Sequence, residues 1–198
     1  MHKVKIGLVG SGFAASLHME AYKMVYGVEP VICALASTSE KAKGFADKYG
    51  IQTVYTSLDE MLQKEKLDVV DICTPPSAHA AQIEKVMMNG CHVICEKPLT
   101  GWFGDHNEPN MLEYVEKQLE ELERVIRASG KKFFYAENFV YAPAVQKSAE
   151  LIEATGAKVL YMKGEESHSG SHAPHAALWS KNGGGSLIRQ GCHPRSFT

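Results

Sequence analysis

The sequence predicts an α/β fold in which a doubly wound parallel sheet is followed by an incomplete α+β domain. Its beginning is a short apolar run that breaks at Gly10-Ser11-Gly12 and continues as a helix from Phe13. Apolar runs and helical segments then alternate as far as Ala136. Runs that are apolar at nearly every position are typical of buried parallel strands, and their alternation with helices predicts right-handed crossovers. We therefore expect an N-terminal Rossmann domain.

The strands of this sheet are expected where β-branched and apolar residues cluster. They fall at residues 4–9, 31–36, 52–55, 69–73, 92–95 and 131–136. Helical spacing predicts helices over residues 13–26, 40–49, 78–88 and 111–129, one that begins at Ser57, and one from Pro143 to Glu153. A further strand is expected over residues 158–164. We place a nucleotide-binding domain at 1–137 and the start of a substrate and oligomerisation domain at 138–198.

Composition and charge narrow the class of protein. The 198 residues are 44% hydrophobic and 22% charged, as in soluble globular proteins, and the net charge of -2 argues against a nucleic-acid partner. Since no apolar run approaches the length of a membrane span and the start leaves no room for a signal peptide, no membrane association is expected. The five cysteines are scattered through apolar runs, which favours reduced thiols in the cytoplasm.

The glycine turn carries the first functional prediction, a site for a dinucleotide. Gly10 permits a tight turn, and Gly12 lets the backbone approach a pyrophosphate, which the N-terminus of the next helix attracts. Ala15 stands at the third position of the fingerprint, where a small residue lets helix and strand pack. Cofactor contacts are expected from the turn and the first helical residues, namely Gly10, Ser11, Gly12, Phe13 and Ala14.

The end of the second predicted strand bears on the choice of cofactor. NAD-preferring folds usually carry an acid there to bind the ribose hydroxyls, whereas this chain has Ser37 and Thr38. Small hydroxyl side chains, with Lys41 and Lys43 nearby, tolerate a 2′-phosphate better than a carboxylate does. The cofactor is thus NADP or NAD, with NADP favoured. Ser37 and Thr38 could equally cap the next helix, and the two interpretations are compatible.

Two more strand ends supply candidate residues for the cofactor cleft. Thr74 and Pro75 follow the fourth strand, with His79 beyond them, and Glu96-Lys97-Pro98 follows the fifth. Ligands of α/β folds bind at the carboxyl ends of the strands. The Lys97 ammonium could therefore donate to, or exchange a proton with, a substrate oxygen beside the nicotinamide.

Histidines elsewhere in the chain receive weaker interpretations. His168, His172 and His175 lie close together, and with Glu166 or His193 they could surround a zinc ion. We favour instead a polar substrate loop containing His168 and His172, and we predict no metal. His18, on the first predicted helix, is interpreted as a packing or helix-face residue.

With the glycine turn, Thr74-Pro75-Pro76 with His79, and Glu96-Lys97-Pro98 in place, the chain resembles the Gfo/Idh/MocA oxidoreductases. The resemblance runs from about residue 3 to residue 193. It implies a Rossmann domain followed by an α/β domain whose open sheet covers the nicotinamide, binds a small-molecule substrate and commonly forms the interface of a homo-oligomer.

By this resemblance Lys97 would be the catalytic lysine, and His193 would match the histidine that acts as acid or base on the reacting hydroxyl. Arg189 stands where the family usually has Asp, and a cation cannot orient an imidazole as a carboxylate does. Substrate contacts are expected from the catalytic pair and the second domain, namely Lys97, Asn138, Tyr141, His168, His172 and His193.

The function expected from these residues is hydride transfer between a nicotinamide cofactor and a sugar, polyol or related substrate. Alternatives are a hydrolase of the same family that oxidises its substrate transiently, or a non-catalytic nucleotide-binding protein. Family members continue well beyond the segment that ends here. We therefore expect a truncated chain whose Rossmann half folds on its own.

Overall fold

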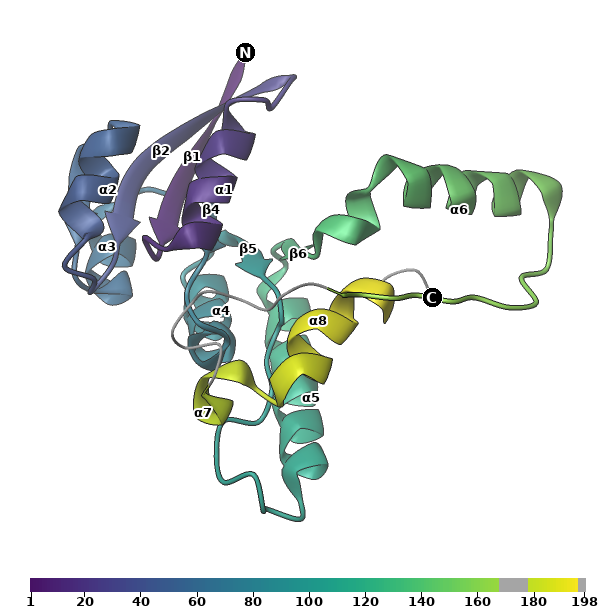
Figure 1. The fold of residues 1–198 in the computed structure, drawn as a ribbon. Helices are drawn as coiled ribbons and strands as arrows, with labels where there is room; N and C mark the ends of the chain where they lie inside the picture. The colour runs from purple at the N-terminus through teal and green to yellow at the C-terminus, as the bar shows by residue number, and fades with distance from the viewer. Residues whose placement is uncertain (168–177, 196–198) are drawn as a thin grey trace.

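The computed structural model describes residues 1–167 and 178–195, and its centre is a six-stranded parallel sheet (Figure 1). The strand order is β3-β2-β1-β4-β5-β6, which places the crossover point between β1 and β4. The strands are β1 (His2–Val9), β2 (Val28–Ala36), β3 (Thr53–Tyr55), β4 (Val69–Ile72), β5 (His92–Glu96) and β6 (Phe133–Ala136). The predicted doubly wound sheet is confirmed.

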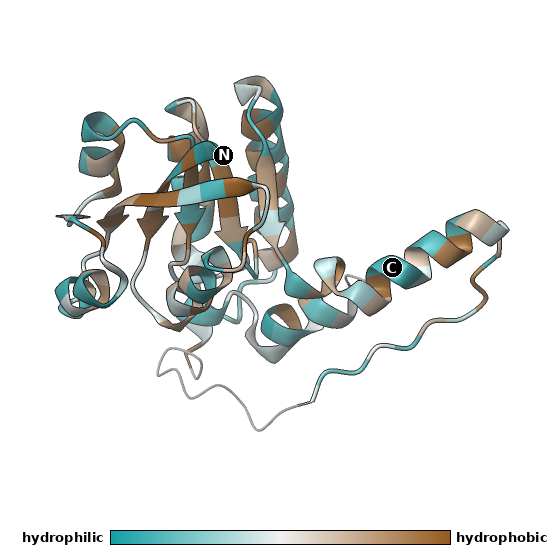
Figure 2. Cartoon of the chain, turned by 90° about the horizontal axis from the view of Figure 1, so that it is seen from above, coloured by the Kyte–Doolittle hydropathy of each residue, from teal (hydrophilic) through white to brown (hydrophobic). Residues whose placement is uncertain are grey.

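Helices cover both faces of the sheet. On one face α1 (Phe13–Tyr22) and α2 (Ala42–Tyr49) pack in one apolar cluster with Leu8 and Leu35. The other face packs Val9, Val70 and Val93 against α3 (Leu58–Lys64), α4 (His79–Met88) and α5 (Met111–Ser129). Figure 2 shows the apolar strands lying between these more polar helices. Adjacent residues of one strand therefore belong to opposite clusters, as the alternation of side chains along a strand requires.

The largest difference from the predicted boundaries is at the connection between α1 and β2. The helix ends at Tyr22, four residues earlier than predicted, and β2 begins at Val28, three residues earlier. The added β2 residues pair with the first residues of β1, from His2 opposite Val28. Tyr26 is fully exposed in the turn between them. Backbone pairing thus extends the strand, and residues 23–27 form the connection that precedes it.

The chain after β6 is less regular. A 3-10 turn (Asn138–Tyr141) leads into α6 (Pro143–Thr155), which projects from the body of the protein and buries none of its residues (Figure 1). The predicted strand over residues 158–164 is wrong, because the described chain forms no strand there. A strand requires a neighbouring strand to pair its backbone, and within the described residues none lies beside this segment.

Two C-terminal helices, α7 (Trp179–Asn182) and α8 (Gly185–Arg195), return to the body, where α7 contacts the 3-10 turn of Pro76–Ala78 (Figure 1). The loop after β5 holds them, since Trp102 N donates a 3.0 Å hydrogen bond to Gly183 O. A Cβ atom on Gly101 would collide with the carbonyl oxygen of Gly183, so this contact requires glycine at residue 101. No helix within the described ranges is both long enough and apolar enough to cross a membrane.

Candidate functional site

The glycine turn between β1 and α1 forms a cradle with the geometry that a diphosphate requires. Gly10 has a φ of +99°, and a Cβ atom there would lie 2.8 Å from the carbonyl oxygen of Cys73. Gly12 is the N-cap of α1, where no side chain caps the helix and a Cβ atom would find open space. The unpaired N–H groups of the first turn and the helix dipole can therefore bind an anion.

At the end of β2 a pair of serine hydroxyls lies beside this cradle. The Oγ atoms of Ser11 and Ser37 are 2.9 Å apart, and Ser37 Oγ also accepts a hydrogen bond from Ser39 N. Thr38 is exposed next to them. Ser39 Oγ in turn accepts from Lys41 N, so these hydroxyls also shape the turn before α2. The two interpretations of this segment remain compatible.

His79 joins the loops that follow β4 and β5. Its two ring nitrogens lie 2.8 Å from the carbonyl oxygen of Thr74 and 2.9 Å from that of Pro98. The side chain is fully buried, and burial lowers the pKa of His79. His79 therefore fixes the positions of Thr74 and of the segment that carries Lys97, while Pro75 stays exposed between the loops.

Lys97 lies at the carboxyl end of β5 and faces α8. Its backbone N–H donates to the Glu96 carboxylate over 2.9 Å, and its Nζ donates to the carbonyl oxygen of Arg189 over 3.3 Å. The side chain is partly exposed. The predicted catalytic lysine thus contacts the helix that carries the predicted catalytic histidine.

His193 is buried and is paired with a carboxylate that the sequence did not reveal. Its Nδ1 lies 2.8 Å from Oε1 of Glu137, the residue directly after β6, whose side chain is fully buried. The same oxygen accepts a hydrogen bond from Phe139 N over 3.1 Å. A buried carboxylate of this kind can hold an imidazole in one orientation.

A second buried carboxylate, Asp71 on β4, lies beneath α1. His18 Nδ1 contacts it at 2.8 Å, and the Tyr22 hydroxyl donates to it over 2.7 Å. His18 Nε2 is 3.3 Å from Glu96. Burial alone would lower the pKa of His18, but hydrogen bonds to Asp71, Cys73 and Glu96 raise it to about 12. The protonated ring therefore links α1 to the ends of β4 and β5.

The fold gathers most of the predicted site residues at the carboxyl edge of the sheet. The glycine turn, the loops after β2, β4 and β5, and α8 meet at that edge. Asn138 and Tyr141 lie on the exposed 3-10 turn beyond β6. His168 and His172 lie outside the described residues. Sequence reasoning missed Glu137, Asp71 and the role of His18, and the signal for each was an ionisable residue within or beside an apolar run.

Among the residues that the structure describes, two sets bring three metal-ligating atoms within 4.8 Å of one another. They are His18 with Asp71 and Cys73, and His193 with Glu137 and Cys192. Of the predicted zinc ligands only His193 belongs to either set, and His168, His172 and His175 lie outside the described residues. In both sets the histidine already contacts the carboxylate at hydrogen-bonding distance. The short contact within each set is therefore that of a hydrogen-bonded histidine–carboxylate pair.

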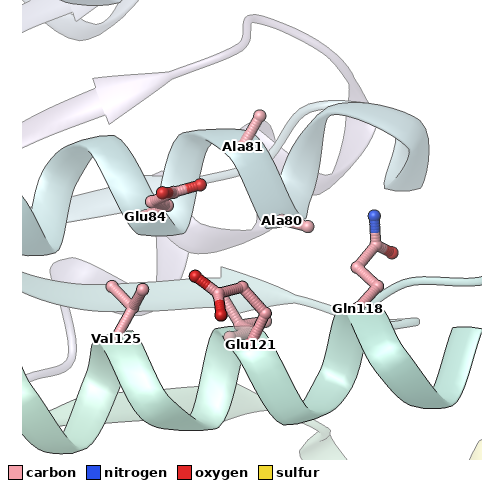
Figure 3. A pocket seen from close by; sticks show the side chains of 7 residues that line it. Ala80, Ala81, Glu84, Gln118, Glu121 and Val125 are labelled. Carbon is pink, nitrogen blue, oxygen red and sulfur yellow. The ribbon is translucent and has the colours of Figure 1, made fainter.

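A shallow pocket of about 250 Å³ lies between α4 and α5 (Figure 3). Its lining comes from these two helices alone, with Glu84 and Glu121 on opposite walls. No residue of the cofactor cradle or of the Lys97 region contributes to it. The site is therefore assigned from the chemistry of the sheet edge and not from this pocket.

Comparison with known proteins places the fold and the sequence in one family. Residues 4–123 match the family described as "Oxidoreductase family, NAD-binding Rossmann fold", GFO_IDH_MocA. The chain belongs to the Gfo/Idh/MocA oxidoreductases, and residues 4–123 have their NAD-binding Rossmann fold.

Its relatives are longer dehydrogenases. D-apiose dehydrogenase of Paraburkholderia graminis is 28% identical over 144 residues, 73% of this chain and 35% of that protein. D-xylose 1-dehydrogenase (NADP(+)) 2 of Haloferax volcanii is 28% identical over 171 residues, which are 85% of this chain and 49% of that protein. A solved NAD-binding oxidoreductase from Klebsiella pneumoniae has 27% identity and a TM-score of 0.75, covering 98% of this chain and 52% of its own. The chain thus spans about half the length of these relatives or less.

Proposed function

We propose that this chain binds a nicotinamide dinucleotide at the carboxyl edge of its sheet and takes part in hydride transfer to or from a sugar, polyol or related substrate. The observation that carries the proposal is the contact of Lys97 with α8, the helix of His193, at the same edge of the sheet as the glycine turn. Similarity to sugar dehydrogenases supports the substrate class. Because those relatives are longer than this chain, the assignment of their enzymatic activity to it is part of the proposal.

In this proposal each group has a distinct task. The cofactor would supply the redox chemistry by accepting or donating the hydride. Gly10 and Gly12 let the backbone approach the pyrophosphate, with Ser11, Phe13 and Ala14 beside it. Lys97 donates a hydrogen bond to the reacting oxygen, and His193 takes or returns its proton. Thr74, Pro75, His79 and Glu96 shape the wall next to the nicotinamide.

We propose NADP as the preferred cofactor. Ser37 and Thr38 replace the acid that would repel a 2′-phosphate, and the Ser11–Ser37 hydroxyl pair can donate to it. The relative from Haloferax volcanii carries NADP(+) in its name. We also propose that residues 138–198 begin a substrate and oligomerisation domain, to which Asn138 and Tyr141 contribute substrate contacts.

The first experiment titrates the purified chain with NADPH and NADH and follows nicotinamide fluorescence and thermal stability. We expect saturable binding, tighter for NADPH, and its loss in a Gly12→Asp variant, where a carboxylate would face the pyrophosphate. D-apiose and D-xylose are then offered with NADP⁺ and NAD⁺ to test turnover. Absence of binding by either cofactor would refute the proposal. If the chain binds a cofactor but turns over no member of a broad panel of sugars and polyols, only the nucleotide-binding part of the proposal stands.

A further inference from the structure

We propose that Glu137 is the positioning residue of His193, holding the proton on Nδ1 so that Nε2 is left as the basic nitrogen for a substrate hydroxyl. The role of Nε2 rests on the proposed function, whereas the state of Nδ1 does not. Arg189 stands where the family resemblance implies an aspartate, and Arg189 does not orient His193.

The contact itself fixes which atom carries the proton. His193 Nδ1 and Glu137 Oε1 are 2.8 Å apart, and Glu137 is fully buried. An ionised carboxylate only accepts hydrogen bonds, so the imidazole nitrogen that faces it must be the donor. The same oxygen also accepts a hydrogen bond from Phe139 N, so it serves as an acceptor in both contacts. A neutral His193 therefore has its proton on Nδ1 and a lone pair on Nε2.

The surroundings hold both partners in place. The Phe139 ring lies 5.1 Å from the imidazole, measured between centroids and tilted by 56°, and so restricts its rotation. Glu137 follows β6 directly, where Ala136 pairs with Glu96 of β5. The sheet register thus places Glu137 beside Lys97, one residue beyond each strand. The carboxylate that orients His193 and the lysine proposed to contact substrate are fixed by the same pair of strands.

Arg189 lies one helical turn before His193 on α8, but its chemistry differs. A guanidinium carries donors only and cannot accept the proton of Nδ1. Arg189 contacts Lys97 through its backbone, because its carbonyl oxygen accepts the hydrogen bond from Lys97 Nζ. The acceptor for His193 therefore comes from the end of β6, 56 residues earlier in the chain.

The test separates the hydrogen bond from the charge. In Glu137→Gln an amide oxygen can still accept from Nδ1, whereas Glu137→Met keeps a similar side-chain volume and removes the acceptor. The tautomer is measured by ¹⁵N NMR of the histidine rings in the protein without added ligand, with His193 assigned from the signals missing in His193→Gln. We expect the Nδ1–H tautomer in the wild type and in Glu137→Gln, and the Nε2–H tautomer in Glu137→Met. The exposed Glu153→Met is the matched control and should leave the His193 signals unchanged.

Steady-state kinetics on a substrate turned over by the wild type provide the second readout. Loss of a residue that orients another group commonly costs about 10- to 100-fold. We expect kcat to fall by about that factor in Glu137→Met, with KM changed less than about threefold, and by less in Glu137→Gln. A loss confined to KM would overturn the positioning role.

The ¹⁵N spectra test the role of Glu137 even if the wild type turns over no substrate. If the wild type shows the Nε2–H tautomer, or if Glu137→Met keeps the Nδ1–H tautomer, the inference is wrong. Stoichiometric zinc binding that Glu137→Gln abolishes would also overturn it, because the Glu137, Cys192 and His193 cluster would then be a metal site. An inactive wild type with the expected spectra would refute the proposed function and leave the Glu137–His193 pairing standing.

Discussion

His18 and Asp71 form an ion pair between α1 and β4, in which Nδ1 lies 2.8 Å from a carboxylate with no exposed surface. The second nitrogen of the ring reaches Glu96, whose other carboxylate oxygen accepts from Lys97 N. A buried anion beneath α1 is thus connected, through His18, to Glu96, the residue that precedes Lys97. The pair affects both the stability of the Rossmann sheet and the position of Lys97.

Replacing His18 by glutamine should destabilise the protein strongly. The substitution leaves Asp71 buried without its cation, and breaking such a pair costs about 3 kcal/mol or more. Urea unfolding measures the loss. His106→Gln is the matched control, because His106 also lies beside an aspartate but on the surface, and it should have no measurable effect. Equal losses in the two variants would contradict the importance of burial.

The His18 pair should also make stability depend on pH in a defined direction. The pKa of His18 is raised from 6.5 to about 12, so the folded protein keeps a proton that the unfolded chain loses. The stabilisation is complete below about pH 6.5 and is lost as the pH rises towards the folded pKa. The difference in unfolding free energy between wild type and His18→Gln should therefore shrink from about pH 7.5 to about pH 9.5. A difference that grows over this range would reverse the sign and exclude the ion pair.

Alanine substitutions at the two glycines of the turn should separate folding from binding. Gly10→Ala forces a side chain into a left-handed backbone and against the Cys73 carbonyl, which should cost about 2 kcal/mol or more. Gly12→Ala meets open space and should change stability by less than about 1 kcal/mol. Its methyl group nevertheless occupies the path of the pyrophosphate, so NADPH affinity should fall. Calorimetry and cofactor titration of both variants test this, and full NADPH affinity in Gly12→Ala would place the phosphate elsewhere.

Much of the sheet could be predicted because its signals are local. The apolar runs placed all six strands, and the boundaries of α5 were predicted to the residue because Met111–Ser129 is amphipathic and ends at Gly130, which adopts a left-handed φ of +64°. The end of α1 was wrong because residues 23–27 form the connection to β2 instead of continuing the helix. The strand expected over residues 158–164 failed for the same kind of reason, since strands depend on a partner.

The pairing of charges in the site could not be predicted. Asp71 is 53 residues from His18, and Glu137 is 56 residues from His193, so both contacts depend on strand order and register. Arg189 indicated that the expected carboxylate near His193 is missing, but the sequence did not show that Glu137 takes its place. By contrast, Lys97 and the glycine turn could be placed because each lies at a strand end, where α/β sheets bind ligands.

The close contact between Gly101 and Gly183 should control whether α8 stays on the body of the protein. Gly101→Ala would push α7 and α8 away, and Lys97 would lose its contact with Arg189 O. Hydrogen exchange of the α8 amides should become faster by at least about tenfold, as expected for a locally opened segment. Cofactor binding should be retained because the glycine turn is formed by other residues. Gly44→Ala, in a helix with open space around it, is the control and should leave exchange in α8 unchanged.

The proposed preference for NADP rests on the residues at the end of β2, so a substitution there should reverse it. Ser37→Asp places a carboxylate beside Ser11, where it can accept from ribose hydroxyls but repels a 2′-phosphate. The variant should bind NADPH at least about tenfold more weakly and NADH equally well or better, a change of about 1.4 kcal/mol between the two. Ser39→Asp, exposed two residues further on, should alter the ratio much less. Because both variants add the same charge, a similar loss of NADPH affinity in each would indicate general repulsion and not recognition of the 2′-phosphate at Ser37.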